Sequence, residues 1–293
     1  MRCLKVATGG RLARRAVARP WISWSIWTWG RLKAAATRWL ARRGLVIDRR
    51  GTANYFTLGP STGRYYPVDF KREWIDTIER VSRFTVTTPE QLAALCSATE
   101  YVVRHKLPGS FVECGVGRGG SVMAIALTLQ RLGVGDRDLY LFDTFHGMTK
   151  PTVVDVDYRG VAYLDHWPSL PNWFSVGASL SEVKAALEMT KYDPARLHFV
   201  EGDVEETLPE HAPSEIALLR LDTDWYESTR HELIHLYPRL VLGGVVIIDD
   251  YGHLEGARKA TDEYFDGHRI LLDRIDYSGR IGLKQEGEAG LRE

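Results

Sequence analysis

Two acidic residues flank a glycine-rich turn near the middle of the chain and suggest where a nucleoside would bind. Glu113 stands directly before the turn at residues 115–120, and Asp143 ends an apolar run more than 20 residues later. Glycine lets the backbone adopt positive φ and approach a ligand that a Cβ would push away. Nucleoside-binding folds place a carboxylate for the ribose hydroxyls at about this spacing. The alternative is that each acid caps local backbone amides.

Four more acids follow two apolar runs nearer the C-terminus: Asp222 and Asp224 after the first, Asp249 and Asp250 after the second. If both runs are strands of one parallel sheet, the acids meet at one edge and repel one another unless a cation lies among them. Oxygen ligands without a neighbouring His or Cys favour Mg²⁺ or Ca²⁺ over zinc. The alternative is that the acids cap the helices that follow. We favour the metal.

The acid before the glycine turn also bears on the choice of cofactor. S-adenosylmethionine presents a ribose, as a dinucleotide does, but it carries no phosphate groups. Its positive sulfur and its amino group favour nearby carboxylates. Glu113 therefore favours S-adenosylmethionine, and a nicotinamide oxidoreductase is the less suitable alternative.

Helices and strands that alternate along the chain would bring these acids together. Thr88 to Gln91 has the pattern of a capping box with proline at the first helical position, and it predicts a helix to about Arg104. Apolar periodicity predicts strands at 110–113, 139–143, 197–200, 216–221 and 245–248, helices after the glycine turn and at 179–189, 228–240 and 254–265, and a hairpin formed by 269–276 and 281–284. This alternation predicts an α/β fold with a mostly parallel sheet, whose ligands bind outside the carboxyl ends of the strands.

The first fifty residues differ from the rest in charge and in tryptophan content. They hold thirteen lysines and arginines against the single acid Asp48, and five of the nine tryptophans, whereas the remaining residues have 25 basic and 37 acidic side chains. We expect a basic, Trp-rich N-terminal arm at 1–50. It packs on the body or on another subunit, which we favour, or it contacts an anionic membrane as a peripheral element. The acidic body argues against nucleic acid as a partner.

Two other segments have open interpretations. Residues 51–87 form an entry segment that either covers the active site or simply packs against the body, and we favour packing. Residues 149–174 form a long insertion rich in aromatic and acidic residues. Loops of this length are often lids or binding loops, and stacked aromatics among acids suit a glycosylated acceptor.

The motifs between about residue 82 and residue 285 resemble those of the macrocin O-methyltransferase family (the TylF/MycF type), a branch of the class I S-adenosylmethionine-dependent methyltransferases. The matching segments are Val112–Val116, Arg118–Ser121, Phe142–Phe145, Gly147-Met148, Thr207–Pro209, Leu221–Asp224, Tyr226–Thr229, Leu236–Leu240, Gly243-Gly244 and Asp249–Gly252. The resemblance implies a Rossmann-like methyltransferase domain at 88–293, with a mostly parallel seven-stranded sheet and a C-terminal antiparallel hairpin.

The resemblance also implies roles for individual residues. The cofactor would lie against Glu113, Gly115, Gly117, Gly119 and Ser121, with Asp143 at the ribose hydroxyls and Asp203 at the adenine. The magnesium ligands would be Asp222, Asp249 and Asp250, with Asp222 also the base. His146, where the family usually has an acid or amide, is a second candidate base or a structural residue. Gly117 stands where the family usually has Trp.

We therefore expect an Mg²⁺-dependent and S-adenosylmethionine-dependent O-methyltransferase acting on a hydroxyl of a sugar-like or glycosylated acceptor, a natural product or a glycan. Mg²⁺ would lower the pKa of the hydroxyl while a carboxylate takes its proton. The alternative is a non-catalytic nucleoside-binding scaffold attached through the basic arm, but a scaffold needs none of the three metal-position acids. The three cysteines show neither disulfide nor zinc spacing, which favours a reducing compartment, so we expect the protein in the cytoplasm, with a membrane-peripheral position as the alternative. We also expect a homo-oligomer.

Overall fold

The computed structural model describes residues 45–47, 53–58, 64–167, 177–266 and 270–286. The chain divides into two compact units, residues 1–58 and 59–293. In the first unit, β1 (Leu45–Ile47) pairs antiparallel with β2 (Ala53–Leu58). Nearly all of the basic arm predicted at 1–50, and the end of the insertion at 168–174, lie outside the described residues. The interpretations of both therefore stay predictions.

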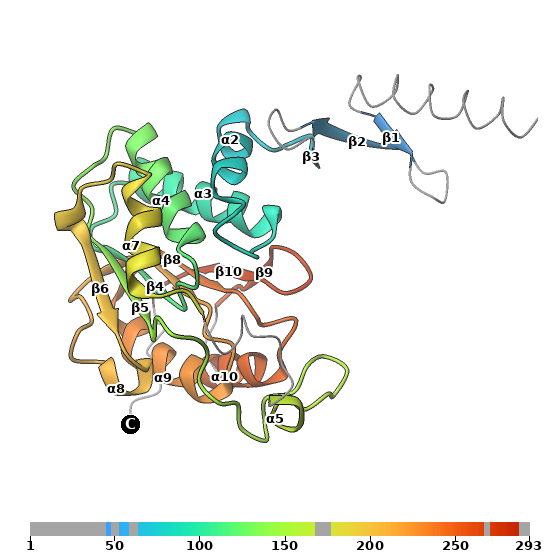
Figure 1. Ribbon diagram of the computed structural model, residues 1–293, viewed down its shortest axis with the longest axis vertical. Helices are drawn as coiled ribbons and strands as arrows, with labels where there is room; N and C mark the ends of the chain where they lie inside the picture. The colour runs from blue at the N-terminus through green and yellow to red at the C-terminus, as the bar shows by residue number, and fades with distance from the viewer. Residues whose placement is uncertain (1–44, 48–52, 59–63, 168–176, 267–269, 287–293) are drawn as a thin grey trace, which may run out of the picture. The chain divides into compact units, whose positions relative to one another are not determined.

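The second unit is built around a seven-stranded sheet of order β6-β5-β4-β7-β8-β10-β9 (Figure 1). Its strands are β4 (Ser110–Cys114), β5 (Leu139–Asp143), β6 (Leu197–Glu201), β7 (Ile216–Leu221), β8 (Leu240–Ile248), β9 (Asp273–Arg274) and β10 (Arg280–Leu283). The five strands from β6 to β8 pair in parallel, and β10 pairs antiparallel with β8 and β9. The predicted mostly parallel sheet with a C-terminal antiparallel hairpin is confirmed.

Helices cover both faces of this sheet (Figure 1). One face carries α2 (Arg72–Val81), α3 (Pro89–Arg104), α4 (Gly120–Arg131) and α7 (Leu180–Glu188), and the other carries α8 (Val204–Thr207), α9 (Tyr226–Leu236) and α10 (Glu255–Phe265). Each face has its own buried apolar cluster: β4 contributes Phe111 to one and Val112 to the other, because successive strand side chains point to opposite faces. No helix in the described ranges is long and apolar enough to cross a membrane.

Short elements complete this unit: β3 (Tyr65–Pro67), α5 (Tyr163–His166), and the 3₁₀ turns η2 (Pro194–Arg196) and η3 (Tyr237–Arg239). The capping box predicted at the start of α3 is confirmed. The Thr88 side chain accepts from the amide of Gln91, while the Gln91 side chain accepts from the amide of Thr88 at 3.1 Å. The helix ends at Arg104, as expected from the sequence.

Three predicted elements have wrong boundaries. The strand expected at 245–248 begins five residues earlier, at Leu240. The helix expected at 228–240 begins at Tyr226 and ends at Leu236, and Leu240 already belongs to β8. Pro238 lacks the N–H that would continue an α-helix, so the chain passes through η3 into the strand. The first strand of the terminal hairpin is also shorter than predicted, because only Asp273-Arg274 pairs with β10.

Candidate functional site

A cavity of about 440 Å³ opens where the parallel strands end. Its lining includes residues that directly follow β4, β5, β6, β7 and β8, together with the segment 84–88 before α3 and Tyr277-Ser278 of the terminal hairpin. This volume lies within the range of small-molecule sites. The glycine turn forms one part of the cavity, and the second group of acids forms another.

The close contact between these two parts requires glycine at position 115. Gly115 has φ of +81°, and a Cβ built there would overlap the backbone carbonyl of Asp222. The amide of Asp222 in turn donates to the carbonyl of Cys114 at 2.9 Å. The end of β4 is thereby held directly against the end of β7, so the two predicted sites are neighbours.

Asp143 holds the glycine turn through backbone amides. Its Oδ2 accepts from the amides of Val116 at 2.7 Å and Gly117 at 2.9 Å, and its Oδ1 accepts from Phe145 at 2.7 Å. These are the turn-capping contacts that were the alternative interpretation. The carboxylate also lines the cavity. Because a carboxylate has about four acceptor positions, it keeps capacity for a ribose hydroxyl.

Of four other residues predicted to contact the cofactor, three line the cavity and one does not. Gly117, Ser121 and Asp203 line the cavity, and a Cβ at Gly117 would meet no atom within 4 Å. The Asp203 carboxylate accepts from the amide of Glu205 and caps α8. Gly119 is the N-cap of α4, with φ of +87°, and is not among the lining residues.

Glu113 lies beneath the cavity. Its side chain is 2% exposed, and its Oε1 lies 2.8 Å from Nη1 of Arg220. Burial raises the pKa of Glu113 to about 7, although the Arg220 charge favours the ionised form. A direct contact between Glu113 and the cofactor therefore stays a prediction, while the contact that the structure gives is with Arg220.

Asp222, Asp249 and Asp250 come together at the ends of β7 and β8, with one oxygen of each within 4.8 Å of the others. Among the described residues, Oδ2 of Asp250 is buried without a hydrogen-bond partner. Removal from water raises the pKa of Asp222 and Asp250 well above the ordinary range, and repulsion by neighbouring carboxylates adds to this. An all-carboxylate set of this kind fits a hard divalent cation.

Asp224 lines the same cavity beside these three acids. Its φ of +70° is uncommon outside glycine. Burial and the charge of Asp222 raise its pKa well above the ordinary range. Aspartate adopts this left-handed conformation more readily than most residues other than glycine, so Asp224 suits the turn after β7.

Aromatic side chains line the cavity as well. The rings of Tyr163 and Trp225 lie 5.5 Å apart, and Oη of Tyr163 lies 3.3 Å from Nε2 of His253. The His253 ring meets Tyr277 edge-on at 5.8 Å. The sequence gave no assignment to His253, whose one signal is its place just after the acids at 249–250.

His146 is not among the residues that line the cavity. Its side chain is exposed, and its Nδ1 lies 2.7 Å from the carbonyl oxygen of Thr144. Its role as a base therefore stays a prediction, and the structure gives it a local contact within its own loop.

The described part of the insertion is docked on the ends of α9 and α10. Asp155 is buried and its Oδ1 accepts from the amide of Tyr226, at the start of α9. The amide of Tyr158 donates to the carbonyl of His253, and the amide of Glu255 donates to that of Val156, both at 2.9 Å. The insertion is thus attached to the segment that follows the acids of β8.

Sequence patterns alone did not identify the residue that connects the acids. Arg220 lies inside the apolar run of β7, is 1% exposed, and pairs with Glu113, Asp222 and Asp249. The available signal was weak: a lone arginine within an apolar strand, two residues before an aspartate and so on the same face of the strand.

Comparisons with known proteins agree with this geometry. The model of the family described as macrocin-O-methyltransferase (TylF) matches residues 69–281. Demethyldecarbamoylnovobiocin O-methyltransferase of Streptomyces niveus is 34% identical over 238 residues, 79% of this chain and 86% of the relative. The 8-demethyl-8-(2,3-dimethoxy-alpha-L-rhamnosyl)-tetracenomycin-C 4'-O-methyltransferase of Streptomyces olivaceus is 35% identical over 198 residues, 67% and 73% of the two chains. The solved structure of the O-methyltransferase NovP aligns with a TM-score of 0.61 at 30% identity, covering 69% of this chain and 82% of that one.

Proposed function

Because this chain belongs to the macrocin O-methyltransferase (TylF) family, we propose that it methylates a hydroxyl of a sugar-like or glycosylated small molecule with the help of Mg²⁺. Membership makes it an S-adenosylmethionine-dependent O-methyltransferase. The acceptor class and the use of Mg²⁺ go beyond membership of the family. The main observation that supports them is that the glycine turn and the acids of β7 and β8 line a single cavity.

The lining of the cavity supports a sugar-like acceptor. Carboxylates that accept from hydroxyl groups lie beside Tyr163 and Trp225, whose rings offer apolar surface to the C–H face of a sugar ring. Val86 and Tyr277 also line the cavity and are 89% and 59% exposed, so they offer apolar surface to the body of a glycoside. The name of the Streptomyces olivaceus relative includes a rhamnosyl group, which agrees with this acceptor class.

The residues present fit a divalent cation. Asp222, Asp249 and Asp250 would hold Mg²⁺, since they offer three clustered carboxylate oxygens and a buried oxygen of Asp250 has no partner in the described part of the chain. When bound, S-adenosylmethionine supplies the methyl group and Mg²⁺ polarises the acceptor hydroxyl.

The side chains of this protein then have separate tasks. Asp143 and the glycine turn position the cofactor against the acids, and positioning of two reactants supplies much of the rate in such transfers. Asp222 takes the hydroxyl proton as the general base. Nη1 of Arg220 lies 2.8 Å from Oδ2 of Asp222, so the two lone pairs of Oδ1 remain for the cation and for the acceptor proton.

The proposal is tested by following transfer of a labelled methyl group from S-adenosylmethionine to a panel of deoxysugar glycosides and of hydroxylated acceptors without a sugar. We expect transfer that EDTA abolishes and Mg²⁺ restores, and Asp249→Asn without turnover but with nearly native affinity for S-adenosylhomocysteine. Asp262→Asn is the matched control, because this exposed aspartate contacts Tyr251 and does not line the cavity. Transfer that persists in EDTA would refute the metal, and transfer only to acceptors without a sugar would refute the acceptor class.

A further inference from the structure

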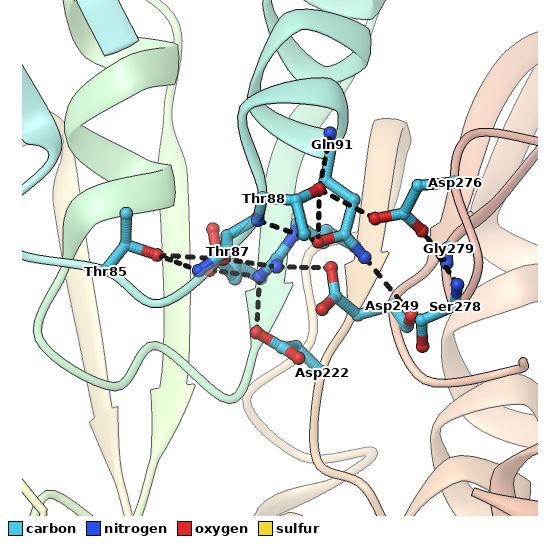
Figure 2. A network of polar contacts seen from close by, with 11 residues as sticks. Thr85, Thr87, Thr88, Gln91, Asp222, Asp249, Asp276, Ser278 and Gly279 are labelled. Carbon is cyan, nitrogen blue, oxygen red and sulfur yellow. Dashed lines mark hydrogen bonds and ion pairs between the residues drawn. The ribbon is translucent and has the colours of Figure 1, made fainter. Parts of the chain in front are cut away.

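We propose that Arg220 is a positioning residue that fixes the orientation of the carboxylates of the metal site. This inference rests on the proposed Mg²⁺ site and adds the residue on which its geometry depends. Arg220 reaches the acids from inside the sheet. Figure 2 labels three of its partners, Thr87, Asp222 and Asp249.

Burial of the Arg220 side chain in the sheet would destabilise the fold if its charge had no partners. It lies in β7, where all six residues from Ile216 to Leu221 are buried. The neighbouring strands place Glu113 of β4 and Ile247 of β8 beside it in register. A buried guanidinium strongly destabilises a fold unless it is paired and hydrogen-bonded. Its partners are therefore part of the reason that the strand accepts it.

Those partners include two of the three candidate metal ligands. Nη1 of Arg220 lies 2.8 Å from Oδ2 of Asp222 and 2.8 Å from Oε1 of Glu113. Nη2 lies 2.5 Å from Oδ1 of Asp249 and 3.2 Å from Oγ1 of Thr87. The planar guanidinium directs its N–H groups in fixed directions, so it holds the carboxylates of Asp222 and Asp249 at a fixed separation.

This arrangement divides the oxygens of each aspartate between two tasks. Asp222 uses Oδ2 and Asp249 uses Oδ1 toward Arg220, which leaves the other oxygen of each for a cation. Arg220 does not replace that cation, since one positive charge cannot balance these acids together with Asp224 and Asp250. Without Arg220, both carboxylates would repel each other and rotate, and the oxygens that meet the metal would no longer be selected.

The same guanidinium also contacts the segment before α3. Thr87 receives the hydrogen bond from Nη2 and is bonded through its hydroxyl to that of Thr85 at 2.8 Å. Gln91 of α3 donates to the backbone carbonyl of Asp249 at 3.3 Å (Figure 2). The segment before α3 and the start of α3 thus contact both the guanidinium of Arg220 and the backbone of Asp249.

The test is Arg220→Lys in the full chain, with Mg²⁺ affinity measured by calorimetry. Lysine keeps the charge, but its three N–H donors share one nitrogen on a flexible stem, so it cannot hold both aspartates in fixed directions. We expect Mg²⁺ affinity to fall about 10- to 100-fold, the range typical of residues that orient metal ligands. Affinity for S-adenosylhomocysteine should stay within about twofold of the wild type, and excess Mg²⁺ should restore much of kcat. Arg239→Lys is the control, because within the described part of the chain its guanidinium donates to backbone carbonyl groups, those of His235, Ala212, Pro213 and Pro209.

Unchanged Mg²⁺ affinity in Arg220→Lys would overturn the inference while leaving the proposed function intact. A wild type that binds no Mg²⁺ would refute the metal part of the proposed function, and the inference with it. If Arg220→Lys does not fold, as judged by circular dichroism, Thr87→Val provides the test without a change of charge. Loss of its hydrogen bond to Nη2 should weaken Mg²⁺ binding about threefold. Affinity equal to that of the wild type would overturn the inference there too.

Discussion

Replacing Asp143 by asparagine tests whether one carboxylate holds both the glycine turn and the cofactor. The native side chain accepts three backbone amides, those of Val116 and Gly117 at Oδ2 and that of Phe145 at Oδ1. Asparagine keeps the shape but has one acceptor oxygen, so its NH₂ group must face at least one N–H donor. The substitution therefore removes hydrogen bonds without opening a cavity.

The expected loss follows from these contacts. Hydrogen bonds to a charged group contribute about 1.5 to 3 kcal/mol each, and neutral ones about 1 kcal/mol. With the asparagine oxygen toward Val116 and Gly117, the bond from Phe145 is lost and the other two weaken. Because Asp143 is only partly buried, we expect the free energy of unfolding to fall by about 2 kcal/mol. A less rigid turn with a weaker ribose acceptor should reduce affinity for S-adenosylhomocysteine by about tenfold or more.

Two measurements check this prediction: urea unfolding and calorimetric titration with S-adenosylhomocysteine. Asp138→Asn is the matched control. Asp138 comes just before β5, at the end of the strand away from the cavity, and it pairs with Arg196 and His198. The control should keep its affinity for the ligand. Native stability and native affinity in Asp143→Asn would show that neither the turn nor the cofactor depends on this carboxylate, and would refute the reasoning.

Three further predictions concern the surroundings of the site. Gly115→Ala should lose both soluble expression and ligand binding, because its Cβ would overlap Asp222, whereas Gly135→Ala should behave as the wild type, since no atom lies within 4 Å of its Cβ. Burial raises the pKa of Glu232 from 4.5 to about 8, so the folded chain keeps a proton that the unfolded chain loses, and stability falls as pH rises between these values. Glu232→Gln should therefore gain stability over the wild type from pH 5 to pH 8 in urea unfolding, and an equal difference at both pH values would contradict this. Thr88→Ala removes the side-chain cap of α3 and should lower the free energy of unfolding by about 1 kcal/mol. Thr88→Ser should recover most of this loss in the same urea assay.

Local chemistry determined much of this structure at the level of sequence. The start of α3 follows from Thr88 and Gln91, which satisfy amides only three residues apart. The turn after β4 follows from the glycines at 115, 117 and 119, which adopt positive φ. The sheet follows from apolar runs of strand length between helices. Parallel strands ending at one edge were enough to bring Asp222 to Asp249 and Asp250. Each of these inferences depends on contacts between near neighbours or on a repeating pattern.

Only the tertiary structure decided what the side chains do at that edge. Arg220 meets Glu113 across 107 residues and Thr87 across 133, and no local pattern specifies such a partner. For the same reason, the sequence did not predict the pairing of Glu113 with Arg220, and the contact of Glu113 with the cofactor stays a prediction. His146 has the right chemistry for a base, but its exposed loop keeps it out of the lining. Residue types and spacing fix which groups are available, and long-range packing fixes which of them meet, because burial allows a charge only where another part of the chain provides its partner.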